Sequence, residues 1–275
     1  MDKVQSSQSS LRETRSITES SLTSLNGDPP IRQLNQYLLT DILGSGSYGT
    51  VHLAREVDQP NSQYAIKELS KSRLAKLSNN PFKKSPQANN AGKLDCVKKE
   101  IAILKKVIHP YIVRLFEVLD DPSVDSLFMV FELLGSPIQQ VSLYEPYDPL
   151  PIEKAQKYFQ QLVLGIEFRT FTNPDNILKT GSDSIKLVDF GVSEMFISSD
   201  DTLRGSKTST TSAFLAPELI SCKKIKESIK ALSNVSGKSA DIWAMGVTLY
   251  SMIFGKLPFK GRGLAELYEN IKNKE

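Results

Sequence analysis

The sequence is poor in the residues that form metal centres and covalent cross-links. Its 275 residues include two cysteines, Cys96 and Cys222, and two histidines, His52 and His109. The cysteines form no CxxC pair and neither lies near a histidine cluster, so the sequence predicts neither a disulfide framework nor a zinc site. This cysteine usage is typical of a reducing compartment, and we expect a cytoplasmic protein.

Long hydrophobic runs and a strong net charge are also missing. The longest apolar run, from Ile242 to Phe254, is about half of what a bilayer requires, and the first ten residues contain no apolar signal core. The net charge of +3 is too small to argue for a nucleic-acid partner. We therefore expect neither a membrane nor a nucleic-acid partner, and a buried helix at the apolar run.

A change of composition at Tyr37 divides the chain. Residues 1–36 are rich in serine, threonine and glutamine and contain few large apolar side chains, which predicts a disordered tail. Antiparallel strands are predicted by alternating segments at residues 37–43, 50–57 and 62–69. Residues 72–95 are polar and rich in lysine and asparagine, which indicates a loop or insert.

The second half of the chain has a different pattern. Val97, Ile101, Leu104 and Ile108 recur at helical spacing, and this helix should end before His109-Pro110. Two more strands are predicted, at residues 111–120 and 126–134. Helices are predicted at residues 152–168, around Leu219, at 241–254 and at 264–272. The sequence therefore predicts an α+β protein with a small β-rich lobe followed by a larger helical lobe.

The segment LGSGSYGTV contains Gly44, Gly46 and Gly49, followed by Val51. The spacing alone is a weak signal, because dinucleotide-binding folds share it, with a helix beginning at the third glycine. The alternation after Gly49 predicts a strand instead, so the glycines should lie at a hairpin tip. Backbone N–H groups at such a tip can approach phosphate oxygens closely, although a plain flexible hairpin is the alternative.

Lys67 follows about twenty residues later, on the strand segment YAIK. A lysine on an inward-facing strand position needs an anionic partner, because an unpaired buried ammonium is costly. Glu100, on the predicted helix, is the natural candidate. The alternative is that Glu100 is a solvated helix charge.

Further short motifs follow in order: MVFELL at 129–134, NPDNIL at 173–178, LVDFG at 187–191, LAPE at 215–218 and DIWAMGVTLY at 241–250. Together with the glycines and YAIK, they resemble the motifs of eukaryotic protein kinases, over nearly everything from Tyr37 onward. The resemblance implies the two-lobe kinase fold, with an N-lobe at residues 37–134 and a C-lobe at residues 135–275.

The resemblance also implies ATP and Mg²⁺ as cofactors. Lys67 would bind the α- and β-phosphates and be oriented by Glu100, with Phe131 as gatekeeper. Asn176 and Asp189 would hold Mg²⁺, and Thr211 is a candidate phosphorylation site. The implied ATP contacts are Leu43, Gly44, Gly46, Gly49, Val51, Ala65, Lys67, the backbone of Glu132 and Leu134, and Leu178.

Three details are similar to calcium/calmodulin-dependent kinase kinases and to fungal upstream activators of AMP-activated-type kinases. They are the long polar insert between Lys67 and Glu100, the segment AFLAPEL, and the segment ADIWAMGVTLYSMIFGKLPF. This resemblance implies a serine/threonine kinase whose protein substrate is the activation loop of another kinase.

One kinase element is missing. Kinases carry an HRDxKxxN loop, whose aspartate accepts the proton of the substrate hydroxyl. Counting back from Asn176, the aspartate position falls on Phe171 and the lysine position on Asn173. Kinases place about eighteen residues between a GIE-type helix and this asparagine, whereas Gly165 and Asn176 are 11 apart here. We therefore expect a kinase fold that is internally deleted and, because the last large-lobe helices are missing, C-terminally truncated.

Three hypotheses follow from these motifs. The first is a working serine/threonine kinase whose sequence, as given, has lost an internal piece and its end, and we expect the chain as written to be inactive. The second is a pseudokinase that acts as a nucleotide-binding scaffold. The third, a dinucleotide-binding oxidoreductase, requires a helix directly after the glycines, and none is predicted.

Overall fold

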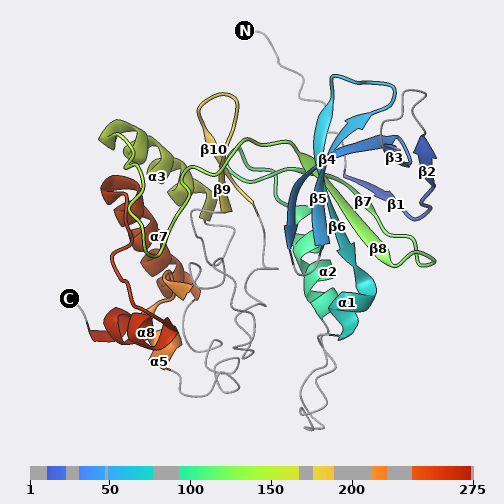
Figure 1. Cartoon of the computed structure of the whole chain (residues 1–275). Coiled ribbons are helices and arrows are strands. Elements are labelled where there is room, and N and C mark those ends of the chain that lie inside the picture. The colour runs from blue at the N-terminus through green and yellow to red at the C-terminus, as the bar shows by residue number, and fades with distance from the viewer. Residues whose placement is uncertain are drawn as a thin grey trace. The chain divides into compact units, whose positions relative to one another are not determined.

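The computed structural model describes residues 11–22, 31–46, 49–76, 93–166, 176–188, 212–221 and 237–273. The chain divides into two compact units, which are described separately (Figure 1). The first comprises Met1–Ile108 and Val113–Leu133, and the second comprises His109–Ile112 and Leu134–Glu275.

The first unit contains an eight-stranded sheet in the order β1-β7-β8-β6-β5-β4-β3-β2. The strands are β1 (Arg12–Thr14), β2 (Glu19–Leu22), β3 (Ile31–Leu34), β4 (Tyr37–Gly46), β5 (Gly49–Glu56), β6 (Gln63–Ser70), β7 (Leu115–Leu119) and β8 (Ser126–Glu132). Neighbouring strands are antiparallel except β1 and β7, which are parallel. The five strands from β4 to β8 confirm the strands predicted from alternation.

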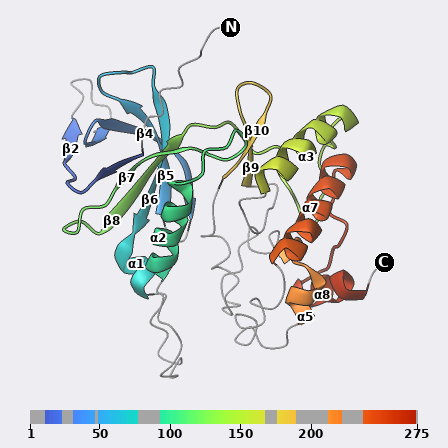
Figure 2. The ribbon, with the colours of Figure 1, turned by 180° about the vertical axis from the view of Figure 1, so that it is seen from behind.

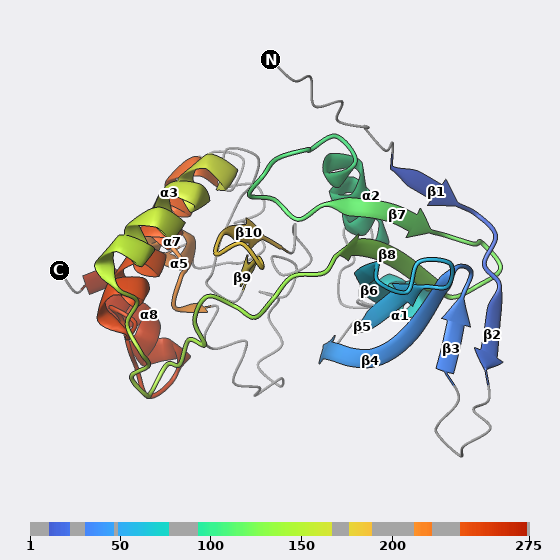
Figure 3. The same ribbon diagram turned by 90° about the horizontal axis from the view of Figure 1, so that it is seen from above.

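The sheet curls strongly. Four strand spacings separate β7 from β4, roughly 19 Å in a flat sheet, yet the Tyr37 hydroxyl donates to Glu117 Oε2 at 2.7 Å. Figure 3 shows β1 and β2, the two ends of the strand order, following one another along one side of the curled sheet. The curl encloses an apolar core of Leu34, Tyr37, Leu39, Ala54, Ile66, Leu119, Phe128 and Val130.

The predicted disordered tail over residues 1–36 is wrong for its described part, residues 11–22 and 31–36, which we call the strap. The strap forms β1, β2 and β3 and pairs with β7 and with β4. Leu34 is fully buried in the core, and Ile17 packs against it. The strap's polar composition concealed these strands, because alternation of apolar and polar residues is the sequence signal of a strand, and only β1 has a partner that is distant in the sequence.

Two short helices complete the described part of the first unit, and they lie beside each other (Figure 2). They are α1 (Lys71–Lys76) and α2 (Lys93–Leu104), so the loop predicted over residues 72–95 is wrong at both ends, and residues 77–92 lie outside the described residues. Helix α2 buries Val97, Ile101 and Leu104 as predicted. It ends at Leu104, before the lysines that follow, so Ile108 lies beyond the helix and is 78% exposed.

The described part of the second unit is mainly helical, as predicted. Its elements are α3 (Ile152–Ile166), β9 (Ile177–Lys179), β10 (Ile185–Leu187), α5 (Pro217–Ser221), α7 (Gly237–Phe254) and α8 (Leu264–Asn273). One apolar core joins α3, the β9–β10 hairpin and α7, and a second joins residues 213–215, α7 and α8. Helix α7 is buried along its middle, whereas Ile242 and Phe254 are exposed, so the predicted burial of that run is wrong at its ends. In the described chain, no helix is both long enough and apolar enough to cross a bilayer.

Candidate active site

The central strands of the first unit bring several predicted ATP contacts together. In the sheet register Val51 lies opposite Lys67, and Ala65 lies opposite Phe131. Successive strand residues point to opposite faces, so Ala65 and Lys67 share one face of β6, and their cross-strand partners share it with them. The register therefore places an apolar patch beside a lysine, an arrangement that suits a flat base next to an anionic group.

The glycine segment forms the turn between β4 and β5, with Gly46 paired to Gly49 and residues 47–48 outside the described residues. A Cβ at Gly49 would lie 1.8 Å from the carbonyl oxygen of Glu68, so glycine is required there by the close approach of β6. A Cβ at Gly44 would meet nothing within 4 Å, and the adjacent Leu43 is 51% exposed. The first glycine thus borders open space, whereas the third is fixed by packing.

The strand that begins at Gly49 also decides between two alternatives from the sequence. A dinucleotide-binding fold needs a helix at the third glycine, and the structure has β5 there. The oxidoreductase hypothesis is therefore wrong.

The predicted pairing of Lys67 with Glu100 stays a prediction. Lys67 is half-buried and has an interaction partner. The backbone of Glu100 lies in α2, but its side chain is outside the described residues, and so are Asp189 and Thr211.

The predicted hinge residue Glu132 is hydrogen-bonded to Arg114, the residue directly before β7. Its backbone N–H donates to the carbonyl of Arg114 at 3.1 Å, and its carboxylate accepts from the Arg114 N–H at 2.7 Å. An adenine contact at Glu132 would therefore use its carbonyl rather than its N–H. Leu134, the other predicted hinge residue, is half-buried and belongs to the second unit.

The second unit holds Asn176 and Leu178 around β9. The backbone carbonyl of Asn176 accepts a bond from the N–H of Val188 at 2.9 Å. Leu178 pairs with Lys186 in the β9–β10 hairpin and forms a bridge with Pro137. Val188 directly precedes Asp189 in the sequence, so this bond links the two chain segments from which the predicted Mg²⁺ ligands come.

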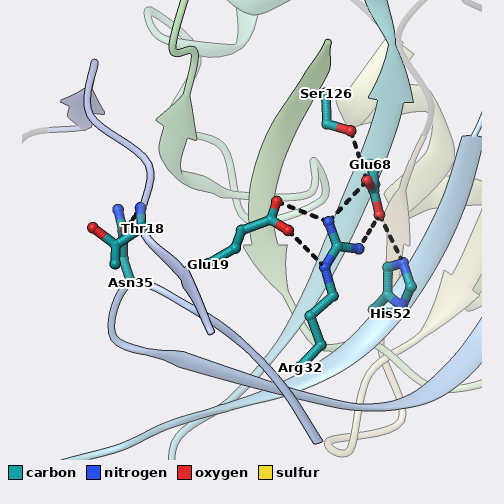
Figure 4. Close-up of polar contacts among 7 residues, drawn as sticks. All are labelled: Thr18, Glu19, Arg32, Asn35, His52, Glu68 and Ser126. Atoms are coloured by element: carbon teal, nitrogen blue, oxygen red, sulfur yellow. Dashed lines mark hydrogen bonds and ion pairs between the residues drawn. The ribbon is translucent and has the colours of Figure 1, made fainter. Parts of the chain in front are cut away.

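A charged cluster around Glu68 was not found from the sequence (Figure 4). Arg32 donates to both Glu68 oxygens, from Nη1 at 2.7 Å and from Nη2 at 3.2 Å, and also to the carboxylate of Glu19. Ser126 Oγ donates to Glu68 at 2.7 Å, and His52 Nε2 lies 3.2 Å from it. Burial by itself would raise the pKa of Glu68, but the bonds from His52, Arg32 and Ser126 outweigh it and hold the pKa well below its usual range.

A second carboxylate, that of Glu117, lies inside the curled sheet and is 2% exposed. It accepts hydrogen bonds from Thr14 Oγ1, from Gln36 Nε2 at 2.9 Å and from the Tyr37 hydroxyl. Burial, followed by the bond to Glu117, raises the pKa of Tyr37 well above its usual range. The sequence signal for these two clusters was a glutamate on a predicted strand. A charged side chain on a buried strand requires a partner, but the sequence does not identify that partner.

The fold and these motifs define a protein kinase, and comparison with known proteins agrees. The protein kinase domain family matches residues 37–275, so the chain belongs to that family. By family it is a serine/threonine protein kinase, a class of transferase that binds ATP and uses Mg²⁺.

Several curated relatives cover most of the chain. A calcium/calmodulin-dependent protein kinase kinase from Caenorhabditis elegans is 38% identical over 259 residues, 88% of this chain and 45% of the relative. The calcium/calmodulin-dependent protein kinase kinase cmkC from Emericella nidulans is 36% identical, over 88% of this chain and 50% of the relative. The chain thus spans about half the length of these two relatives. The serine/threonine-protein kinase ppk34 from Schizosaccharomyces pombe is 34% identical, over 95% of this chain and 78% of that protein.

Proposed function

We propose that the native product transfers the γ-phosphate of ATP to a serine or threonine in the activation loop of a downstream kinase. The substrate hydroxyl oxygen would form a bond to the γ-phosphorus, ADP would leave, and the hydroxyl proton would pass to a base. The names of the two kinase kinases support the substrate class. The main structural support for ATP binding is the strand register, which places Val51 opposite Lys67 and Ala65 opposite Phe131.

The kinase family assigns different parts of the nucleotide to different residues. Ala65 and Val51 would contact the adenine, and Lys67 would pair with the α- and β-phosphates. The open space at Gly44 fits a phosphate-binding backbone, since no atom of the described residues lies within 4 Å of a Cβ placed there. Asn176 supplies an amide oxygen of the kind that Mg²⁺ accepts, and with Asp189 it would hold the ion that neutralises the phosphates.

For the chain as it stands, we propose nucleotide binding without measurable phosphoryl transfer. The aspartate of the HRD loop has no counterpart, because its position falls on Phe171. Loss of a general base alone costs roughly 10²- to 10⁴-fold in rate. In that case the chain would be a pseudokinase that acts as a nucleotide-binding scaffold. If its transcript encodes the missing HRD segment, the native product would be an active kinase.

Two measurements test this proposal. ATP·Mg²⁺ binding is measured by calorimetry, and phosphate transfer to an activation-loop peptide is followed with radiolabelled ATP. We expect binding that Lys67→Met weakens, and no transfer above background. Strong transfer that Lys67→Met abolishes would refute the proposed inactivity, and absence of ATP binding would refute the nucleotide role.

A gain-of-function variant separates the kinase from the scaffold hypothesis. An HRDxK-containing segment of about seven residues is inserted within residues 167–175, at the gap that the kinase motif predicts. The matched control carries the same insert with asparagine in place of its aspartate. Transfer by the insert variant but not by the control supports a kinase whose sequence has lost a piece, whereas no transfer by either supports the scaffold.

A further inference from the structure

Arg32 links the strap to the strand that carries Lys67. Strand β3, which holds Arg32, is three spacings from β6 in the sheet order, roughly 14 Å in a flat sheet. The curl brings the two together, and the guanidinium bonds both oxygens of Glu68. Such a two-point contact fixes the orientation of the carboxylate as well as its distance.

Glu68 is the residue next to Lys67, on the opposite face of β6. The backbone of a strand transmits position between its faces, because adjacent side chains share one peptide unit. Glu68 is held from three strands at once: by Arg32 of β3, His52 of β5 and Ser126 of β8. Its carbonyl also approaches Gly49 closely, at the glycine turn. A shift of Glu68 would therefore move both Lys67 and the turn.

The strap itself is firmly attached, so Arg32 is a fixed anchor. Leu34, two residues away, is fully buried, and the Arg32 guanidinium also lies over the Phe128 ring, 5.4 Å from its centre. At the other end of the strap Thr14 donates to the buried Glu117. An anchored arginine can hold β6 at lower entropic cost than a free one.

We infer that Arg32 is a positioning residue for nucleotide binding, which sets the position of Lys67 through Glu68, so that the nucleotide-binding unit begins in the strap and not at Tyr37. This inference rests on the proposed nucleotide role of Lys67. The strap lies outside residues 37–275, the part of the chain that matches the kinase family.

The test uses the full chain with three variants. Arg32→Ala removes the anchor, Arg32→Lys keeps the charge but not the two-point contact, and Arg12→Ala is the matched control on the same strap. Arg12 is mostly exposed and makes no contact with Glu68 among the described residues, since its ion pair is with Glu117 at 3.8 Å. Affinities for ATP·Mg²⁺ and for adenosine are measured by calorimetry, at a temperature at which circular dichroism shows every variant folded.

The ratio of the two affinities separates positioning from general loosening. Lys67 would contact phosphates, which adenosine lacks. We expect Arg32→Ala to weaken ATP binding about tenfold, equivalent to one charge-assisted hydrogen bond, with adenosine binding unchanged. Arg32→Lys should recover part of the loss, and Arg12→Ala should match the wild type. Equal losses for ATP and adenosine, or the same loss in Arg12→Ala, would overturn the inference.

Hydrogen exchange of the β6 amides gives a readout that needs no nucleotide. Arg32→Ala should lower protection at residues 66–69, and Arg12→Ala should not. If the wild-type chain binds no ATP, the proposed function fails while this exchange result still decides whether Arg32 holds β6. Wild-type protection in Arg32→Ala would reject the inference even if ATP binds.

Discussion

The two units use carboxylates in contrasting ways. In the first unit, residues from several strands hold the buried Glu117 and the partly buried Glu68. In the second unit, Asp183 lies on the turn between β9 and β10 with its side chain 56% exposed. It nevertheless accepts a bond from the Tyr158 hydroxyl at 2.8 Å and pairs with Lys154 and Lys157.

Similar numbers of partners therefore carry different energetic weight. An exposed ion pair is screened by water and contributes little. A buried acceptor that loses its charge or its geometry leaves donors unsatisfied, which costs much more. The comparison indicates that the polar clusters of the first unit contribute to its stability beside its apolar core, whereas the exposed Asp183 contributes little to the stability of the second unit.

The largest effect should come from the buried carboxylate of Glu117. Glu117→Gln removes the negative charge and replaces one acceptor oxygen by an amide NH₂, which is itself a donor. The donors of Gln36 and Tyr37 then lose a charged acceptor, so the free energy of unfolding should fall by about 2–3 kcal/mol. The matched amide substitution Asp183→Asn should leave the thermal midpoint within error, because water replaces the lost bonds. Urea titration followed by circular dichroism measures both variants. Equal effects of the two substitutions would contradict the comparison.

A smaller effect is expected at the glycine turn. Gly49→Ala would place a methyl group against the carbonyl oxygen of Glu68, and we expect a loss of about 1–3 kcal/mol through displacement of β5 from β6. Gly44→Ala meets open space and should fold like the wild type. Hydrogen exchange across β5 and β6 distinguishes the two variants. Wild-type exchange in Gly49→Ala would show that β5 and β6 accommodate the methyl group without separating, and would contradict this prediction.

The smallest effect is expected in the pH dependence of stability that comes from Glu68. The folded-state pKa of Glu68 lies below its ordinary value of 4.5, so the folded protein binds this proton less readily than the unfolded chain. Its stabilisation is complete above about pH 5 and is lost as the pH falls below 4.5 toward the folded-state pKa. Glu68→Gln should therefore be less stable at neutral pH but lose less stability between pH 5 and pH 3. Parallel pH profiles of the unfolding midpoint for the variant and the wild type would contradict this assignment.

The sequence predicted well where local pattern and function coincide. Alternation located β4, β5, β6, β7 and β8, and helical spacing located α3, α7 and α8. The glycine spacing and the motif order predicted the family correctly. Helix ends were less predictable: α2 stops at Leu104, and Ile108 is exposed.

By itself, the sequence determined the kinase family, the central strands and the absence of an HRD motif, because each of these depends on residues that are adjacent in the sequence. Only the tertiary structure decided that the strap extends the sheet at both of its ends, beside β7 and beside β4, and that Arg32 meets Glu68. Thr14 and Glu117 are 103 positions apart and Arg32 and Glu68 are 36 apart. The physical reason is that a short polar strand has no preferred structure alone, and its contacts with β7 and with Glu68 join residues that are far apart in the sequence.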